Sequence, residues 1–164
     1  RAIGRRSALG FSAELDGPVG ERNLYTLHPR GRLLLAPQTA SGLFHQLAAT
    51  LATGNAAVID RGSRLDEALP DLPERIAARV TWSAAWEADG PFAGALVEGD
   101  ADRIKAVALR VADCPGPLVP VQAASMRALQ SDPDAYCTDW LLEEISTSIN
   151  TAAAGGNASL MTLV

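Results

Sequence analysis

Residues 32–59, RLLLAPQTASGLFHQLAATLATGNAAVI, contain the pattern that decides the fold. Arg32–Ala36 is a short apolar run typical of a buried strand. A helix is predicted next, because five apolar residues recur at helical spacing: Leu43, Phe44, Leu47, Ala48 and Leu51. Thr39 or Ser41 can cap its start, Gly54 can end it, and Ala56–Ile59 follows as a second buried strand. Strand, helix and strand with short connections predict a parallel βαβ unit with a right-handed crossover.

The alternation continues toward the C-terminus. Leu65–Val80 is helical in composition, but two prolines interrupt it, so we expect the regular helix to begin near Pro73. Phe92–Val97 is predicted as a strand, and Leu118–Gln122 as another, although a proline weakens it. Between them Asp100 is predicted to cap a second amphipathic helix, with the apolar stripe Ile104, Val107, Ala108 and Val111. This order predicts an α/β fold: an open, mostly parallel, Rossmann-like sheet with helices on both faces.

The two ends of the chain have different patterns. Residues 1–15 are interpreted as a linker or helical lead-in, and 16–142 as the α/β domain, in which 23–28 looks extended. Residues 145–150 alternate between apolar and polar, as a half-exposed strand does. Residues 158–164 are predicted as a second strand, so 143–164 is interpreted as a C-terminal β-hairpin flap. An isolated hairpin is marginal in water, and we expect this one to need a surface to lie on.

Composition restricts the classes of function. The chain has 164 residues, is 48% apolar and carries a formal net charge of -5, which argues against a nucleic-acid partner. The apolar runs are too short for a membrane segment, and no signal peptide is recognisable, so the cytoplasm is expected. Cys114 and Cys137 are interpreted as reduced, structural thiols. Because the chain begins at Arg1 rather than Met, we expect it to be a piece of a longer protein.

Catalytic and metal-binding signatures are missing from the sequence. The expected assignment is therefore no catalytic, cofactor-binding or metal-binding residue in this chain. His28 and His45 are far apart and are interpreted as ordinary surface or boundary histidines. Cys114 is placed at a helix C-terminus, which raises a thiol pKa and does not suit a nucleophile. A complete small hydrolase or transferase would lack a nucleophile–base pair.

The loop after the Phe92–Val97 strand is where a doubly wound fold would hold a phosphate. Here it contains Glu98, Asp100 and Asp102, three carboxylates that we expect to crowd the first turn of the next helix. They suit the helix dipole and would repel a pyrophosphate.

The Leu43–Ile59 segment, with its Gly54-Asn55 element, resembles the aldehyde dehydrogenase superfamily. In that family the following strand leads to a lysine at the NAD ribose, whereas this chain has Asp60-Arg61. A family Gly-Ser at the pyrophosphate is replaced here by Gly99-Asp100, and the catalytic glutamate by Gln122. No segment matches the family's nucleophilic-cysteine loop.

Three further motifs resemble the C-terminal domain of the proline utilization A family: residues 17–23 (GPVGERN), 29–31 (PRG) and above all 150–162 (NTAAAGGNASLMT). The resemblance runs from about Asp16 to the end of the chain. It implies a degenerate aldehyde-dehydrogenase-like domain of a bifunctional bacterial flavoenzyme that oxidises proline to glutamate. Its flap would cover the dehydrogenase module and help to seal the cavity through which the intermediate passes. The FAD, the NAD and the catalytic residues would lie upstream, so none is assigned to this chain.

The resemblance makes the flap the candidate interaction site, with the dehydrogenase module of the parent chain as its partner. The flap residues expected to take part are Ile145, Ile149, Asn150, Thr151, Gly155, Gly156, Asn157, Leu160 and Met161. Two alternatives stay open: a weak dinucleotide site at the carboxyl ends of the strands, and a dimerisation module in which flaps pair or swap.

Overall fold

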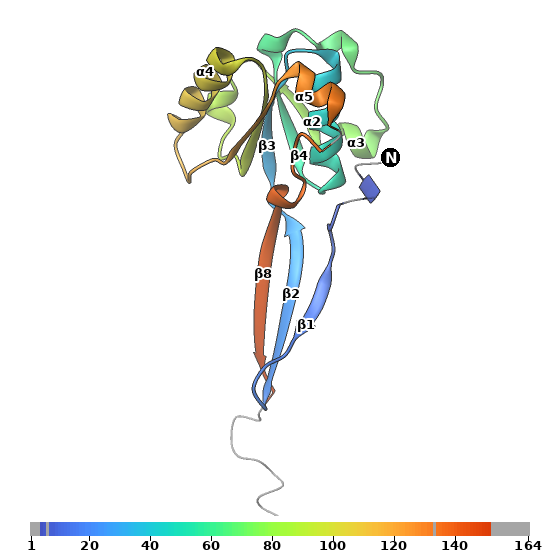
Figure 1. The fold of residues 1–164 in the computed structure, drawn as a ribbon, viewed down its shortest axis with the longest axis vertical. Helices are drawn as coiled ribbons and strands as arrows, with labels where there is room; N and C mark the ends of the chain where they lie inside the picture. The colour runs from blue at the N-terminus through green and yellow to red at the C-terminus, as the bar shows by residue number, and fades with distance from the viewer. Residues whose placement is uncertain (1–3, 6, 133, 152–164) are drawn as a thin grey trace, which may run out of the picture.

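The computed structural model describes residues 4–5, 7–132 and 134–151, and it has two parts (Figure 1). A head contains a five-stranded sheet with its helices. A three-stranded sheet projects from one end of this head and is called the stalk here. Among the described residues no helix has the length and apolarity needed to cross a membrane.

The sheet of the head is parallel throughout and has the strand order β5-β4-β3-β6-β7. Its strands are β3 (Arg32–Ala36), β4 (Ala56–Asp60), β5 (Val80–Ser83), β6 (Gly94–Glu98) and β7 (Val121–Ala124). From β3 the chain runs outward to β4 and β5, then returns to add β6 and β7 on the other side. The order therefore reverses between β3 and β6, which makes the carboxyl ends of these two strands a topological switch point.

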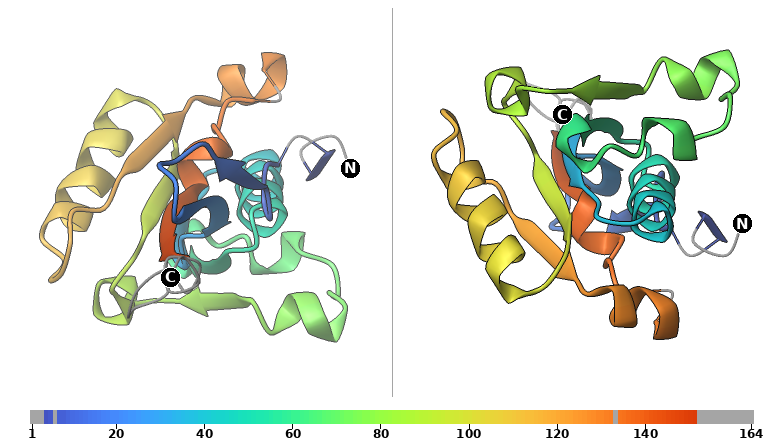
Figure 2. Two further views of the ribbon diagram at one scale, coloured as in Figure 1. Left: turned by 90° about the horizontal axis from the view of Figure 1, so that it is seen from below. Right: turned by 90° about the horizontal axis from the view of Figure 1, so that it is seen from above.

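Both faces of the head sheet are covered, as predicted. Alternate residues of β3 point to opposite faces: Leu33 and Leu35 pack in the cluster under α2 (Ala40–Ala52) and α5 (Met126–Ser131). Leu34 belongs to the opposite cluster with Val107 and Val111 of α4 (Ala101–Ala112). Figure 2 shows α2 and α4 on opposite sides of the sheet. The head thus has a hydrophobic core of its own, and the α/β fold class is confirmed.

The predicted caps of the two long helices are confirmed. Thr39 is the N-cap of α2, where its side chain accepts a hydrogen bond from Gly42 N, and Asp100 caps α4 through Arg103 N. Gly54, just beyond α2, has a φ of +72° that favours glycine. One member of the predicted stripe differs, because Phe44 is 45% exposed and the buried polar residue Gln46 takes part in the inward face instead.

Two stretches of the head differ from the sequence-based expectation. Most of Leu65–Val80 is not α-helical: it holds η2 (Asp66–Ala68), the single-turn α3 (Glu74–Ala77) and the start of β5. Pro70 and Pro73 keep the helix from beginning earlier, and it ends after one turn because the chain from Val80 pairs with β4. The last strand begins at Val121 rather than Leu118, because Pro120 has no N–H for the ladder and supplies only its carbonyl to Ala95 N. The remaining short elements are η1 (Arg61–Ser63), η3 (Trp86–Asp89) and η4 (Asp139–Leu141).

The stalk is an antiparallel sheet of order β1-β2-β8, with β1 (Ser12–Leu15), β2 (Glu21–Pro29) and β8 (Leu142–Asn150). Ser12–Leu15, which the sequence placed in a lead-in, forms a strand because it pairs with β2 from Ser12↔Thr26 to Leu15↔Asn23. The first predicted flap strand is confirmed as β8. Its neighbour in the described chain is β2, paired over all nine residues. The predicted second flap strand, 158–164, lies outside the described residues.

Candidate functional site

One face of the stalk presents a row of apolar and hydroxyl side chains. Because side chains alternate across a strand, Ile145, Thr147 and Ile149 of β8 share a face. Leu24 of β2, which pairs with Thr147, lies on the same face. Ile145 is 39% and Ile149 40% exposed, so the two predicted anchor residues are in place but not covered by the described chain.

The opposite face of the stalk is also apolar and also open. It carries Phe11, Leu15 and Tyr25, with Phe11 51% and Leu15 46% exposed. The rings of Phe11 and Tyr25 meet edge to face, with centroids 6.3 Å apart. Burial, followed by the hydrogen bond and the charge of Glu144, raises the pKa of the Tyr25 hydroxyl. Within the described chain the stalk therefore has apolar side chains on both faces and no core of its own, a pattern typical of a sheet that packs against a further surface.

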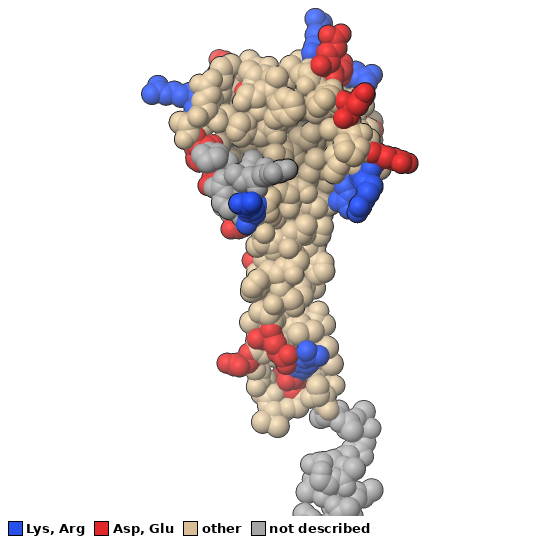
Figure 3. All heavy atoms as spheres, turned by 90° about the vertical axis from the view of Figure 1, so that its right-hand side faces the viewer, with Lys and Arg blue, Asp and Glu red and all other residues tan. Residues whose placement is uncertain are grey.

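The outer edge of β8 is a second open feature. In the strand order β1-β2-β8 this strand has a neighbour on one side only within the described chain. An edge strand that has no neighbour in the described chain along residues 142–149 is a template for strand addition. Figure 3 shows few charged side chains along the middle of the stalk, whereas charges gather at its tip, where Arg22 pairs with Glu14 at 3.1 Å.

The remaining predicted flap residues are only partly described. Asn150 is the last residue of β8 and pairs with Glu21, and Thr151 N donates to the Gly20 carbonyl at 2.8 Å. Gly155, Gly156, Asn157, Leu160 and Met161 lie outside the described residues.

A shallow hollow of about 470 Å³ lies where the head meets the stalk. It is lined by Arg30 and Arg32 together with prolines and by Leu118, which is 97% exposed. Arg30 donates from Nη1 to the Trp140 carbonyl at 2.9 Å, and the Trp140 side chain is itself 65% exposed. These exposed side chains continue the open surface of the stalk onto the head.

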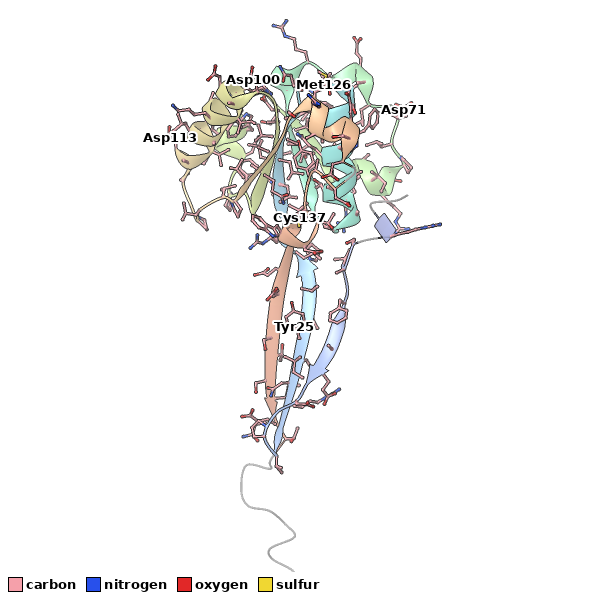
Figure 4. The ribbon with its side chains drawn as sticks, in the orientation of Figure 1. Tyr25, Asp71, Asp100, Asp113, Met126 and Cys137 are labelled. Carbon is pink, nitrogen blue, oxygen red and sulfur yellow. The ribbon has the colours of Figure 1, made fainter. Side chains whose placement is uncertain are left out.

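The opposite end of the head contains the switch-point crevice, and Glu98 fills it. Asp100, labelled in Figure 4, marks this end, far from Tyr25 on the stalk. Glu98 is only 1% exposed. One carboxylate oxygen accepts hydrogen bonds from Gln38 N at 2.7 Å and Thr39 N at 2.8 Å, and the other from the Thr39 hydroxyl at 2.7 Å.

This placement corrects the expectation that Glu98, Asp100 and Asp102 all crowd the first turn of α4. Strand β6 continues through Glu98, so Glu98 shares the face of Leu96, which packs in the cluster under α2. Its carboxylate therefore lies at the N-terminus of α2. Only Asp100 and Asp102 remain at α4, as the N-cap and a first-turn residue.

The residues at the positions of the aldehyde dehydrogenase motifs are engaged in structural contacts. Asp60 caps η1 by accepting a hydrogen bond from Gly62 N at 2.9 Å. In the aldehyde dehydrogenase superfamily the corresponding strand leads to a lysine instead. Gln122, in place of the catalytic glutamate, exchanges two hydrogen bonds with the Cys137 backbone, at 2.7 and 3.0 Å. With Glu98 inside the crevice, these residues do not fit a dinucleotide.

The other titratable candidates are separate from one another. His28 Nε2 lies 2.9 Å from the Thr26 hydroxyl, and His45 donates from Nδ1 to the Ser41 carbonyl at 2.8 Å. Cys114 and Cys137 are both free thiols. Burial, reinforced by the charges of two nearby carboxylates, raises the pKa of the Cys114 thiol, in the direction that the sequence predicts. In the described ranges no cluster of three His, Cys, Asp or Glu side chains could hold a metal ion.

Comparisons with known proteins find close relatives over nearly the whole chain. It is 64% identical over 163 residues to the bifunctional protein PutA of Rhizobium meliloti, covering 99% of this chain and 13% of that protein. It is 38% identical over 155 residues to the bifunctional protein PutA of Salmonella typhimurium, covering 94% of this chain and 11% of the relative. The chain therefore spans about an eighth of the length of these relatives. No protein-family model matches the chain.

Solved structures agree with this similarity. A structure of proline utilization A with proline bound in remote sites superposes with a TM-score of 0.55 at 25% identity, over 76% of this chain and 14% of that one. An AldH from Staphylococcus aureus gives a TM-score of 0.56 at 16% identity, over 76% and 31% of the two chains, which shows a shared fold.

Proposed function

The chain belongs to the PutA family of bifunctional proteins, of which it corresponds to one segment, and we propose that it is a non-catalytic C-terminal docking domain. In this proposal the stalk docks on the aldehyde dehydrogenase module of the same cytoplasmic, proline-oxidising flavoenzyme. It helps to close the cavity through which the semialdehyde intermediate passes. FAD, NAD and the catalytic residues belong to the rest of the parent chain.

The observation that carries the proposal is a sheet with two apolar faces that no other part of the described chain covers. The stalk exposes Ile145 and Ile149 on one face and Phe11 and Leu15 on the other. Burying a side chain of this kind contributes about 1.5–3 kcal/mol, so covering even one face provides a substantial driving force. The open edge of β8 adds backbone hydrogen bonds that are independent of side-chain identity.

The shape of the chain supports a sealing role more than a catalytic one. A second hollow is lined by Arg30 and Trp140 of the head together with Glu143 and Glu144 at the start of β8, so one partner can contact both parts. The switch-point crevice lies at the far end of the head and is filled. The surface that a partner protein could contact thus lies at one end of the molecule, and the switch point, where this class of fold binds ligands, lies at the other.

The test is coupled turnover of proline to glutamate in the full-length parent protein. The variant carries Ile145→Asn and Ile149→Asn, which makes one face of β8 polar. The matched control carries Ser146→Asn and Ser148→Asn, on the other face of the same strand. We expect a lag in NADH formation and escape of intermediate in the isoleucine variant only, with each separate activity retained.

Coupled turnover without a lag in the isoleucine variant would remove the support for a channel seal. An equal lag in both variants would point to a general loss of the strand rather than to one docking face. The same assay can test the flap residues outside the described structure with Gly155→Val. Gly155-Gly156 permits backbone dihedrals that other residues avoid, so this variant should also show a lag.

A homodimer is the second candidate, and the open edge of β8 favours it, because an edge strand can pair with its copy. Sedimentation velocity of the chain over a range of concentrations distinguishes the two. A monomer at all concentrations leaves the parent module as the partner. The weak dinucleotide site has no such support, and titration of NAD while Trp82 and Trp86 fluorescence is recorded tests it directly.

A further inference from the structure

The switch point between β3 and β6 is the position where open α/β sheets bind their ligands. The N-terminus of α2 faces it, with backbone N–H groups that have no acceptor within the helix and with the positive end of a 13-residue helix dipole. Phosphates bind at such helix ends in this fold class. In this chain the anion at that position is a side chain, the carboxylate of Glu98.

The donors at the N-terminus of α2 form a cradle that matches one carboxylate. Gln38 N and Thr39 N converge on Oε2 of Glu98, and the Thr39 hydroxyl reaches Oε1. The same hydroxyl accepts from Gly42 N at 3.0 Å, so the Thr39 side chain is fixed from both sides. Hydrogen bonds to charged groups are about twice as strong as those between neutral groups.

The space for the carboxylate exists because position 42 is glycine. A Cβ at Gly42 would lie 2.9 Å from Oε1 of Glu98 and closer still to Cδ and Oε2. Any other residue would therefore overlap the bound carboxylate. Without this constraint alanine would be the more favourable residue at the third position of a helix.

Arg103 spans the two sides of the crevice. From α4 it donates through Nε to the Glu98 carbonyl at 3.0 Å and through Nη2 to the Pro37 carbonyl at 3.0 Å. The first carbonyl ends β6 and the second follows β3. The guanidinium therefore ties together the two strand ends between which a ligand would enter.

We propose that the N-terminus of α2 is a carboxylate-binding cradle whose permanent ligand is Glu98 of the same chain. The cradle takes a small free carboxylate only when the Glu98 side chain is removed, and it excludes nucleotide phosphates while Glu98 is present. The two halves of the sheet are then held together by an internal ligand. The head consequently keeps one shape at any concentration of dinucleotide, which suits a domain that presents a fixed docking surface.

The test uses the 164-residue chain with Glu98→Ala, and formate as the probe. Formate carries the carboxylate without the side-chain stem, so it can occupy the vacated position. We expect Glu98→Ala to melt several degrees below the original chain and to regain part of this loss in sodium formate. Sodium chloride at equal ionic strength should give no such gain, and the original chain should respond equally to both salts.

The amide resonances of Gln38 and Thr39 report on the cradle itself. They should move on formate addition in Glu98→Ala and stay unchanged in the original chain, where NAD and inorganic phosphate should also have no effect. A folded Glu98→Ala without a formate-specific response would overturn the proposal. So would movement of these two resonances in the original chain on addition of NAD.

A second variant keeps the proposal testable if Glu98→Ala does not fold. Glu98→Gln preserves the side-chain volume but replaces one acceptor oxygen by a donor and removes the charge. We expect the Gln38 and Thr39 amide protons to shift upfield in Glu98→Gln, because their hydrogen bonds weaken. Unchanged resonances in this variant would show that the carboxylate is not their ligand. This result is independent of the docking role, which the coupled assay tests separately.

Discussion

Gly42→Ala should destabilise the chain although it places a better helix former inside a helix. Alanine in place of glycine stabilises a helix interior by about 1 kcal/mol. Here the added Cβ would overlap the Glu98 carboxylate, so the carboxylate or the first turn of α2 must move. Glu98 is only 1% exposed, so a displaced carboxylate would not reach solvent by a small movement.

The magnitude follows from what the displaced carboxylate loses. Three hydrogen bonds to a charged acceptor are worth about 1.5–3 kcal/mol each, so breaking two of them costs about 3–6 kcal/mol. A partial shift that weakens all three should cost a similar amount, and the gain in helix propensity offsets about 1 kcal/mol. The expected net loss is about 2–5 kcal/mol. This is a large part of the free energy of unfolding of a typical domain, which is about 5–15 kcal/mol.

Urea denaturation followed by tryptophan fluorescence measures this loss, with Ser41→Ala as the matched control on the exposed side of the same turn. The control should stay within about 0.5 kcal/mol of the original chain. The decisive measurement is Gly42→Ala in the Glu98→Ala background, where the overlap no longer exists. There the same change should be neutral or slightly stabilising. An equal loss in both backgrounds would refute the reasoning, because the two residues would then act independently.

Two further predictions concern buried polar groups of the head. Burial, reinforced by the negative charge of Glu98, raises the pKa of Tyr136 above its ordinary value of 10.0. As the pH rises through about 10, the unfolded chain loses a proton that the folded chain keeps, so stability should fall from there toward the raised folded-state pKa of Tyr136, and less steeply in Tyr136→Phe. Asn55 is 1% exposed, accepts from Gly31 N and donates to the Leu141 carbonyl, both at 2.8 Å. Asn55→Ala leaves both partners unpaired and should lower the free energy of unfolding by about 2–4 kcal/mol in urea titrations, whereas a loss below about 0.5 kcal/mol would contradict this role.

The head could be predicted from sequence because its signals are local. The stripe around Leu43 and Leu47, the Thr39 cap and the terminating Gly54 lie within one segment of α2. Each of these residues acts on neighbours three or four positions away, which is the range that sequence patterns report. The βαβ unit and the two-sided sheet follow from them.

The stalk could not be predicted in the same way, because its pairing is non-local. β2 and β8 are separated by more than a hundred residues, and nothing in Glu21–Pro29 specifies Leu142–Asn150 as its neighbour. The alternation in 145–150 indicated a strand with one exposed face but not which strand it joins. Ser12–Leu15 has no consistent period of its own, and only pairing with β2 makes it a strand.

Glu98 shows how a one-residue difference in a strand end changes the interpretation of a site. With the strand ending at Val97, Glu98 belongs to a loop and adds charge to the start of α4. With β6 continuing to Glu98, the period of two places its side chain with Leu96 on the α2 face. The period-two pattern of the strand therefore predicts the direction of the Glu98 side chain once the strand is extended by one residue.

The two ends of the molecule use polar and apolar groups in opposite ways, and this contrast bears on function. At the carboxyl ends of the strands, Glu98 and Arg103 satisfy the donors and acceptors that a ligand would otherwise engage. At the other end, the described chain leaves Ile145 and Ile149 of the stalk exposed and gives β8 a neighbouring strand on one side only. A domain selected to bind a small molecule would show the reverse, with an open crevice and covered apolar surfaces. This distribution of groups is what the proposed docking role requires: a protein surface as the partner, bound at the stalk rather than at the switch point.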